Sequence, residues 1–172
     1  MKTLLLTGAP GVGKTTVLRK VAAGLPGWKV AGFYTEEIRS SHGERYGFRL
    51  VCFDGRSGVM ARADFPGPRR VGKYGVDVAV IDDLTPAALS LDQPADVYLV
   101  DEIGKMECLS EQFVVAMTGL LASGKPVVAT VALHGVGFID EVKRRTGVQI
   151  WQVTRGNRDS IPADILAWLK KP

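Results

Sequence analysis

The sequence predicts one α/β domain in which helices cover both faces of a mainly parallel sheet, with an antiparallel hairpin added to it. Short apolar runs that suit buried strands alternate with amphipathic segments that suit helices. The 172 residues are the length of a single domain, so residues 1–172 are expected to fold as one unit. A glycine-rich turn joins the first expected strand to the first expected helix, a connection typical of parallel α/β sheets.

The first half of the chain opens with an apolar run over residues 2–7 that lacks alternation, as expected of a strand buried on both faces. Residues 14–23 then carry apolar side chains on one face and end at Gly24, which predicts a helix. Further on, Asp54-Gly55 between two strand-like runs is a strong hairpin signal. The other elements expected in this half are a strand over 29–36, hairpin strands over 45–53 and 57–62, a loop over 64–73, a short strand over 76–81 and a short helix over 85–91.

The second half continues the alternation of strands and helices. Residues 96–100 lead a buried strand that ends in two carboxylates, and residues 110–123 carry apolar side chains at helical spacing before Gly124. Because helices separate the strands, parallel pairing through helical crossovers is expected. The remaining elements are a strand over 127–133, a helix over 138–145, a strand over 148–153 and a closing helix over 162–170.

Composition and charge narrow the class of protein. With 46% hydrophobic and 23% charged residues the chain matches an ordinary globular domain, which excludes a disordered chain. No run approaches the ~20 apolar residues of a transmembrane helix, and the apolar start is too short for a signal peptide. We therefore expect a cytoplasmic protein without a membrane partner. Its two cysteines, Cys52 and Cys108, are expected to be reduced thiols and not zinc ligands.

The net charge of +4 is scattered along the chain. There is no run of five like charges, and no aromatic residues are interleaved with the basic ones. A groove for nucleic acid usually shows a denser basic stripe, so a nucleic-acid partner is not favoured.

A complete phosphate-binding motif follows the first expected strand. The pattern G-x-x-x-x-G-K-[ST] is matched at every fixed position by Gly8-Ala9-Pro10-Gly11-Val12-Gly13-Lys14-Thr15. Glycines allow the positive φ angles with which successive N–H groups converge on phosphate oxygens, and the helix that starts there adds its N-terminal dipole. Lys14 is expected to contact the β- and γ-phosphates, and the Thr15 hydroxyl to hold Mg²⁺.

A second candidate group lies where a buried strand ends in acids, in the run Val97-Tyr98-Leu99-Val100-Asp101-Glu102. Ligands bind at the carboxyl ends of strands in open α/β sheets, so Asp101 is expected to face the phosphate-binding turn and to bind Mg²⁺, directly or through water. Glu102 is expected to accept the proton of an attacking water. The predicted catalytic residues are Lys14, Asp101 and Glu102, and the predicted metal-holding residues are Thr15 and Asp101.

The acidic run continues as Asp101-Glu102-Ile103-Gly104, which has the D-x-x-G spacing of GTPase switches. Gly104 is therefore a candidate to donate its N–H to the γ-phosphate. The guanine-reading pattern [NT]-K-x-D follows none of the later expected strands, so no preference for GTP is inferred.

Several longer strings recur together and in order in one protein family. They are Gly32-Phe33-Tyr34-Thr35-Glu36-Glu37-Ile38-Arg39, Arg45 with Gly47-Phe48, Asp101-Glu102-Ile103-Gly104-Lys105-Met106-Glu107, and Asn157-Arg158-Asp159. With the phosphate-binding motif, they make nearly the whole chain resemble the thermophilic nucleoside-triphosphatase family, which includes the so-called cancer-related nucleoside-triphosphatase.

The resemblance implies a three-layer, RecA-like P-loop fold. It also implies slow, Mg²⁺-dependent hydrolysis of nucleoside triphosphates (ATP, GTP, CTP and UTP) to a diphosphate and phosphate, with broad tolerance of the base. Two nucleotide-binding stretches carry over from the family, residues 8–15 and 97–104.

Some questions stay open at the level of the sequence. The general base is Glu102 or one of Glu36 and Glu37, which end an earlier strand. After the last strand, Arg155 and Arg158 are candidates for base contact or for an arginine finger, and Asn157 is a candidate to hydrogen-bond a base edge. One rival interpretation is a small-molecule kinase with residues 62–73 as a basic lid. A second is a nucleotide-gated switch that binds RNA or protein. A monomer is favoured for the oligomeric state.

Overall fold

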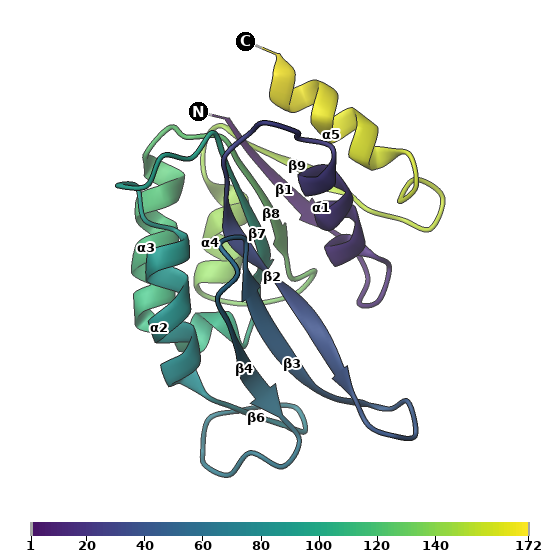
Figure 1. Cartoon of the computed structure of the whole chain (residues 1–172), viewed down its shortest axis with the longest axis vertical. Coiled ribbons are helices and arrows are strands. Elements are labelled where there is room, and N and C mark those ends of the chain that lie inside the picture. The colour runs from purple at the N-terminus through teal and green to yellow at the C-terminus, as the bar shows by residue number, and fades with distance from the viewer. Residues whose placement is uncertain (1, 172) are drawn as a thin grey trace.

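The strands form one mixed sheet whose two halves differ in strand direction (Figure 1). The structure is a computed structural model that describes residues 2–171, and within them the strand order is β5-β6-β4-β3-β2-β7-β8-β1-β9. Pairing is parallel from β2 through β7, β8 and β1 to β9, and antiparallel from β2 through β3, β4 and β6 to β5. The bounds are β1 (Thr3–Thr7), β2 (Val30–Arg39), β3 (Arg45–Cys52), β4 (Ser57–Arg62), β5 (Arg70–Val71), β6 (Tyr74–Val76), β7 (Val97–Ile103), β8 (Val127–Val131) and β9 (Val148–Gln152).

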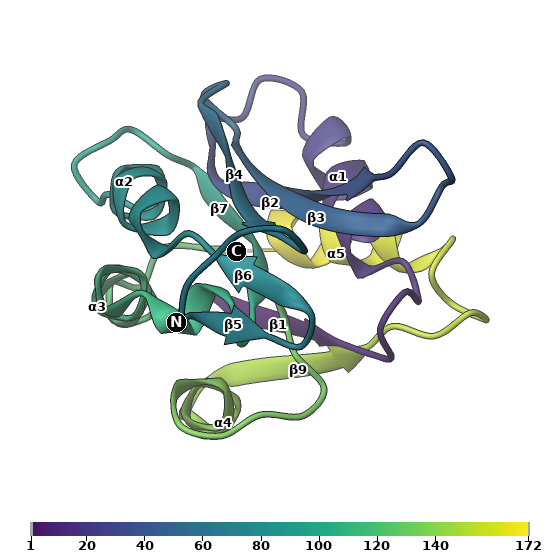
Figure 2. The same ribbon diagram turned by 90° about the horizontal axis from the view of Figure 1, so that it is seen from below.

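Helices cover both faces of the parallel half, which gives the three layers that the sequence predicts. Viewed from below, α1 and α5 lie on one side of the sheet, and α2, α3 and α4 lie on the other (Figure 2). Within residues 2–171, no helix has the length and hydrophobicity that a membrane span requires. The helices are α1 (Lys14–Ala23), α2 (Val78–Ala88), α3 (Glu111–Ala122), α4 (Phe138–Arg144) and α5 (Ile161–Lys170), with a short 3₁₀ helix η1 (Glu107–Leu109).

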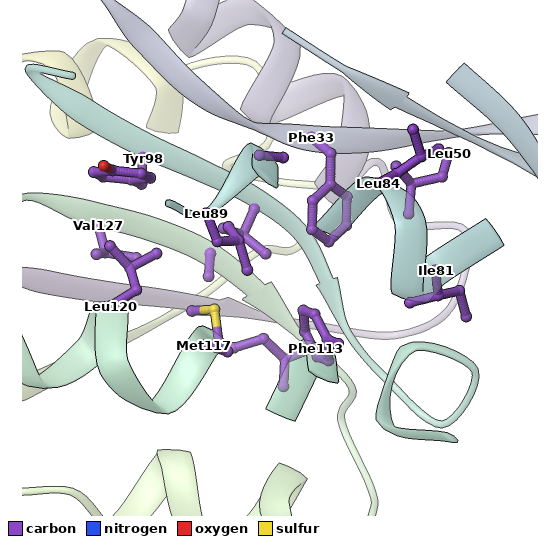
Figure 3. Packing of buried hydrophobic residues seen from close by; sticks show 14 of the residues in the cluster. Phe33, Leu50, Ile81, Leu84, Leu89, Tyr98, Phe113, Met117, Leu120 and Val127 are labelled. Carbon is purple, nitrogen blue, oxygen red and sulfur yellow. The ribbon is translucent and has the colours of Figure 1, made fainter. Parts of the chain in front are cut away.

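Alternation of side chains along the central strands separates two hydrophobic cores. Leu5 belongs to the cluster formed with α2, α3 and α4, whereas its neighbour Leu4 belongs to the cluster formed with α1 and α5. In the first cluster, shown in Figure 3, Phe33 meets Phe113 edge to face with ring centroids 6.1 Å apart. Because both faces of these strands are buried, their sequences consist of continuous apolar runs.

One stretch contradicts the sequence prediction. The strand expected over 76–81 is wrong, because β6 ends at Val76 and α2 begins at Val78. The helix expected over 85–91 exists but with other bounds, since α2 begins seven residues earlier and ends at Ala88. The Asp77 carboxylate caps that helix by accepting a hydrogen bond from the Ala79 N–H at 3.1 Å. Ile81 and Leu84 are then buried on one helix face, so packing overrides the strand propensity of the β-branched residues in this stretch.

The antiparallel half extends past the parallel strands as an arm, defined here as residues 35–76 (Figure 1). The parallel pairing of β2 with β7 ends at Phe33 and Val100, but β2 continues to Arg39 in antiparallel pairing with β3. The strand expected over 29–36 is therefore too short, because its extension depends on the partner strand. The loop expected over 64–73 contains the two residues of β5.

Candidate active site

The phosphate-binding turn connects β1 to α1 at the carboxyl ends of the parallel strands (Figure 1). Gly11 and Gly13 have φ angles of 73° and 111°, in the left-handed region that favours glycine. Gly13 is also the residue that precedes the first turn of α1. The two glycines thus give the turn the conformation that the motif predicts.

Gly8 is needed for a different reason, the close approach of two chain segments. A Cβ atom at this position would lie 2.5 Å from the carbonyl oxygen of Val153, the residue after β9. The Val153 N–H donates to the Thr7 carbonyl at 2.7 Å. A side chain at position 8 would therefore push the turn away from the end of β9.

Lys14 places its positive charge over the turn. Its Nζ donates to the Gly8 carbonyl at 3.0 Å and lies 3.4 Å from the Ala9 carbonyl oxygen. The ammonium group thus stands at the turn whose N–H groups suit phosphate oxygens, and its contact with the β- and γ-phosphates stays a prediction.

Asp101, at the carboxyl end of β7, joins three elements of the site. The side chain is only 2% exposed. Its Oδ2 accepts a hydrogen bond from Thr15 Oγ1 at 2.6 Å, and also from Thr35 Oγ1 at 3.1 Å and Thr35 N at 3.3 Å. Its Oδ1 accepts a hydrogen bond from Thr130 Oγ1 at 2.7 Å. The structure therefore brings Thr15 and Asp101 together, although β8 lies between β1 and β7 in the sheet.

Glu102 is partly buried beside Asp101. Burial is the main cause that raises the pKa of its carboxyl, the negative charge of Asp101 raises it further, and Lys14 acts in the opposite direction. A carboxyl with a raised pKa takes up a proton more readily than an exposed one, a property that suits a general base.

Gly104 leaves room for two carboxyl side chains. A Cβ atom there would lie 2.9 Å from Glu107 Oε2 and 3.2 Å from Glu102 Cδ. Glu107, which the sequence reasoning did not single out, is 3% exposed. Burial raises its pKa well above the usual value, and the charge of Glu102 adds to the effect. Donation from the Gly104 N–H to a γ-phosphate stays a prediction.

The two alternative bases are engaged in ion pairs. Glu37 accepts hydrogen bonds from Arg39, at 2.5 Å, and from Arg45. Glu36 lies 4.0 Å from Arg19 of α1. Glu37 in particular is bound on both carboxylate oxygens, so it is less available than Glu102 to accept a proton.

Arg158 lies over the phosphate-binding turn. Its Cδ is 3.6 Å from the position that a Cβ of Gly13 would take, and its NH1 donates to the Val12 carbonyl at 3.4 Å. Arg155 is exposed and lines a hollow of about 280 Å³ between the turn and the chain after β9. The structure therefore brings both arginines to the turn that the sequence marks for phosphate.

Asn157 holds the loop after β9 in place. Its Oδ1 accepts from the Thr154 N–H and its Nδ2 donates to the Gln152 carbonyl, both at 2.8 Å. Both the oxygen and the nitrogen of the amide are thus hydrogen-bonded within the loop. This weakens the interpretation of Asn157 as a residue that recognises a nucleobase.

Residues 62–73, the basic loop considered as a kinase lid, form hydrogen bonds among themselves. Arg62 pairs with Asp64 at 2.7 Å, and Arg70 donates to the carbonyls of Phe65 and Lys73 at 3.0 and 2.6 Å. These guanidinium groups are committed to the loop itself, so the structure gives the kinase interpretation no support.

Sequence reasoning missed Thr35 and Thr130 as parts of the site. Thr35 lies two residues past the end of the parallel pairing of β2 with β7, and Thr130 lies one residue before the end of β8. Threonine is common in strands, so its presence there is no signal by itself. Only the register of β2 and β8 against β7 brings the two hydroxyls to Asp101.

A phosphate-binding turn between β1 and α1, bonded through Thr15 to the acidic end of β7, defines the class as a P-loop NTPase fold. Comparison with known proteins gives the family. A sequence profile described as NTPase matches residues 3–166. The chain belongs to this nucleoside-triphosphatase family, as the sequence predicts.

The relatives match along nearly their whole length. The chain is 42% identical over 168 residues to nucleoside-triphosphatase THEP1 of Thermotoga petrophila, covering 97% of this chain and 92% of that protein. It is 36% identical over 182 residues to the human cancer-related nucleoside-triphosphatase, covering 95% and 94%. The crystal structure of THEP1 from Aquifex aeolicus superposes with a TM-score of 0.88 at 34% identity, covering 99% of this chain and all of that one.

Proposed function

We propose that the protein hydrolyses nucleoside triphosphates to a diphosphate and phosphate with Mg²⁺ as cofactor. The observation that carries this proposal is the 2.6 Å hydrogen bond from Thr15, in the phosphate-binding motif, to the acidic end of β7. The names of the relatives, which are nucleoside-triphosphatases, support the same reaction.

The residues at this point fit Mg²⁺. It is a hard cation that takes oxygen ligands and is usually held by one or two carboxylates together with substrate phosphates. Thr15 Oγ1 and Asp101 Oδ2 supply one hydroxyl and one carboxylate oxygen beside the turn. When bound, Mg²⁺ would neutralise phosphate charge that builds up as the γ-phosphate is transferred.

The chain itself supplies the other parts of the reaction. Backbone N–H groups within residues 8–15, where Pro10 alone has none, bind the phosphates together with the Lys14 ammonium and hold them in one orientation. Glu102 orients the attacking water and accepts its proton, while the Asp101 carboxylate is reserved for the metal. Arg158, over the turn, is placed to stabilise negative charge on the phosphates.

The experiment measures phosphate release from ATP, GTP, CTP and UTP, with Mg²⁺ and with a chelator. We expect release only with Mg²⁺, and its loss in Lys14→Ala. Lys125→Ala, at an exposed lysine just before β8 and away from the turn, is the matched control and retains activity. Wild-type turnover in a folded Lys14→Ala protein would overturn the proposal. ADP formation that depends on an added alcohol would favour the kinase interpretation instead.

A further inference from the structure

The two carboxylate oxygens of Asp101 have different kinds of partner. Oδ1 is bonded to the hydroxyl of Thr130, a fully buried residue of β8. Oδ2 is bonded to Thr15 of the phosphate-binding turn and to Thr35 of β2, and both of these residues are partly exposed. One oxygen therefore faces the packed interior, and the other faces the site where a ligand has access.

Thr35 lies in the part of β2 that no longer pairs with β7. It lies two residues after Phe33, the last residue of β2 that pairs with β7, and there it pairs with Leu50 of β3. The Thr35 hydroxyl and backbone N–H both point to Asp101 Oδ2, at 3.1 and 3.3 Å. Three oxygens from three separate elements, α1, β2 and β7, thus converge on one point.

We propose that the Thr35 hydroxyl is a further oxygen of the Mg²⁺ site, whereas the Thr130 hydroxyl only positions Asp101. This inference rests on the proposed function, since it extends the same metal site. Octahedral Mg²⁺ with ligands at 2.0–2.1 Å separates neighbouring ligand oxygens by about 2.9 Å. The distances from Asp101 Oδ2 to the hydroxyls of Thr15 and Thr35, 2.6 and 3.1 Å, lie on either side of that value.

The chemistry of a hydroxyl allows this role. A threonine hydroxyl that donates its hydrogen to a carboxylate keeps its oxygen lone pairs for a cation. Thr15 and Thr35 donate to the same carboxylate oxygen, so their own oxygens lie around it. Thr130 donates to the other oxygen from a side chain without solvent exposure, where no ligand can enter.

The arrangement also connects the metal to the arm, because the arm begins at Thr35. A metal held by Thr15, Asp101 and Thr35 would tie the base of the arm to α1 and β7. Binding of a nucleotide with Mg²⁺ is then expected to slow hydrogen exchange of the arm amides near Thr35 more than binding without Mg²⁺ does.

The test measures binding of the β,γ-imido analogue of ATP with Mg²⁺ and with a chelator. The variants are Asp101→Asn, Thr35→Val, Thr35→Ser and Thr130→Val. We expect the gain in affinity due to Mg²⁺ to fall by about 100-fold in Thr35→Val, to survive in Thr35→Ser and to fall less, by about 10-fold, in Thr130→Val, which removes only a hydrogen bond to the Asp101 carboxylate. Affinity without Mg²⁺ is expected to change little in Thr35→Val, Thr35→Ser and Thr130→Val, because these changes keep the local charge, and to rise in Asp101→Asn, which removes a negative charge beside the phosphates. Thr35→Ala replaces Thr35→Val if the valine variant does not fold.

Three results would contradict the inference. If Asp101→Asn loses the Mg²⁺ gain while Thr35→Val and Thr35→Ala keep it, the proposed function stands and only the role of Thr35 is overturned. If Thr35→Val and Thr130→Val lose the gain equally, both threonines only position Asp101. If the wild type shows no Mg²⁺ gain, the metal site of the proposed function fails and Thr35 fails with it.

Discussion

The parallel half of the sheet and the arm are built on different principles. Every residue of β8 is buried, and so are all but one in β7, because helices cover both faces. In β3 of the arm, three residues are buried and the other five are partly or fully exposed. Parallel strands need helical crossovers and are therefore enclosed, whereas antiparallel strands joined by short turns can leave one face in water.

The candidate functional residues lie mainly in the enclosed, parallel half. The carboxyl ends of the enclosed strands hold Lys14, Thr15 and Asp101 against a rigid background, in a partly desolvated position where charges interact strongly. Charges on the arm neutralise one another at the surface, as Glu37 does with Arg39 and Arg45. Thr35, where the arm leaves the parallel half, connects the two regions through its hydrogen bonds to Asp101.

The largest expected difference between the two regions is in catalysis. Glu102→Gln is expected to lower kcat by about 10²–10⁴-fold and to leave nucleotide affinity near the wild-type value, because a general base acts mainly in the transition state. Glu37→Gln, the same change on the arm, is expected to retain kcat. Single-turnover rates measured beside nucleotide affinity check both. Near wild-type hydrolysis by Glu102→Gln would move the search to Glu36.

The next difference concerns stability. Val128→Ala removes two methyl groups from a fully buried site in β8 and is expected to lower the free energy of unfolding by about 2–3 kcal/mol. Val59→Ala, in β4 of the arm, makes the same change at a partly exposed site and is expected to cost about 1 kcal/mol or less. Urea unfolding of the two variants gives the comparison. Equal losses would mean that the arm packs as tightly as the parallel half.

A smaller effect on kcat/KM is expected when the nucleobase of the substrate changes. Thr154, Arg155 and Arg158, which follow β9 near the turn, are exposed, and the Asn157 amide is used within its own loop. We therefore expect kcat/KM to vary by less than about 30-fold among ATP, GTP, CTP and UTP, or ~2 kcal/mol. Steady-state kinetics with the four triphosphates measure this. A 10⁴-fold preference, the scale that buried polar contacts to a base can reach, would show a base site that these contacts do not explain.

The smallest effect belongs to the ion pairs of the arm. Glu37 and its two arginines are all substantially exposed, so Glu37→Gln is expected to lower the free energy of unfolding by only about 0.2–1 kcal/mol. Salt screens exposed charges, and the difference from wild type should shrink further at about 1 M NaCl. Thermal unfolding at two salt concentrations checks the prediction. A loss that is large and insensitive to salt would assign the cluster a packing role.

The elements that sequence patterns predict best are those fixed by local chemistry. The phosphate-binding turn follows from Gly11 and Gly13, because few other residues adopt their positive φ angles. The strand before Asp101 follows from an uninterrupted apolar run. Prediction failed over residues 76–91, where β-branched residues favour a strand locally, and where Asp77 and the packing of Ile81 on the sheet select a helix.

By itself, the sequence determined the class of protein, the turn with Lys14 and Thr15, and the acidic strand end at Asp101, since each depends on neighbouring residues along the chain. Tertiary structure alone decided which other residues reach Asp101. Thr35 and Thr130 lie 66 and 29 positions away from it in the chain, and they meet it because the registers of β2 and β8 against β7 bring both hydroxyls to its carboxylate. The physical reason is that contacts between strands depend on pairing across the sheet, which no local pattern encodes.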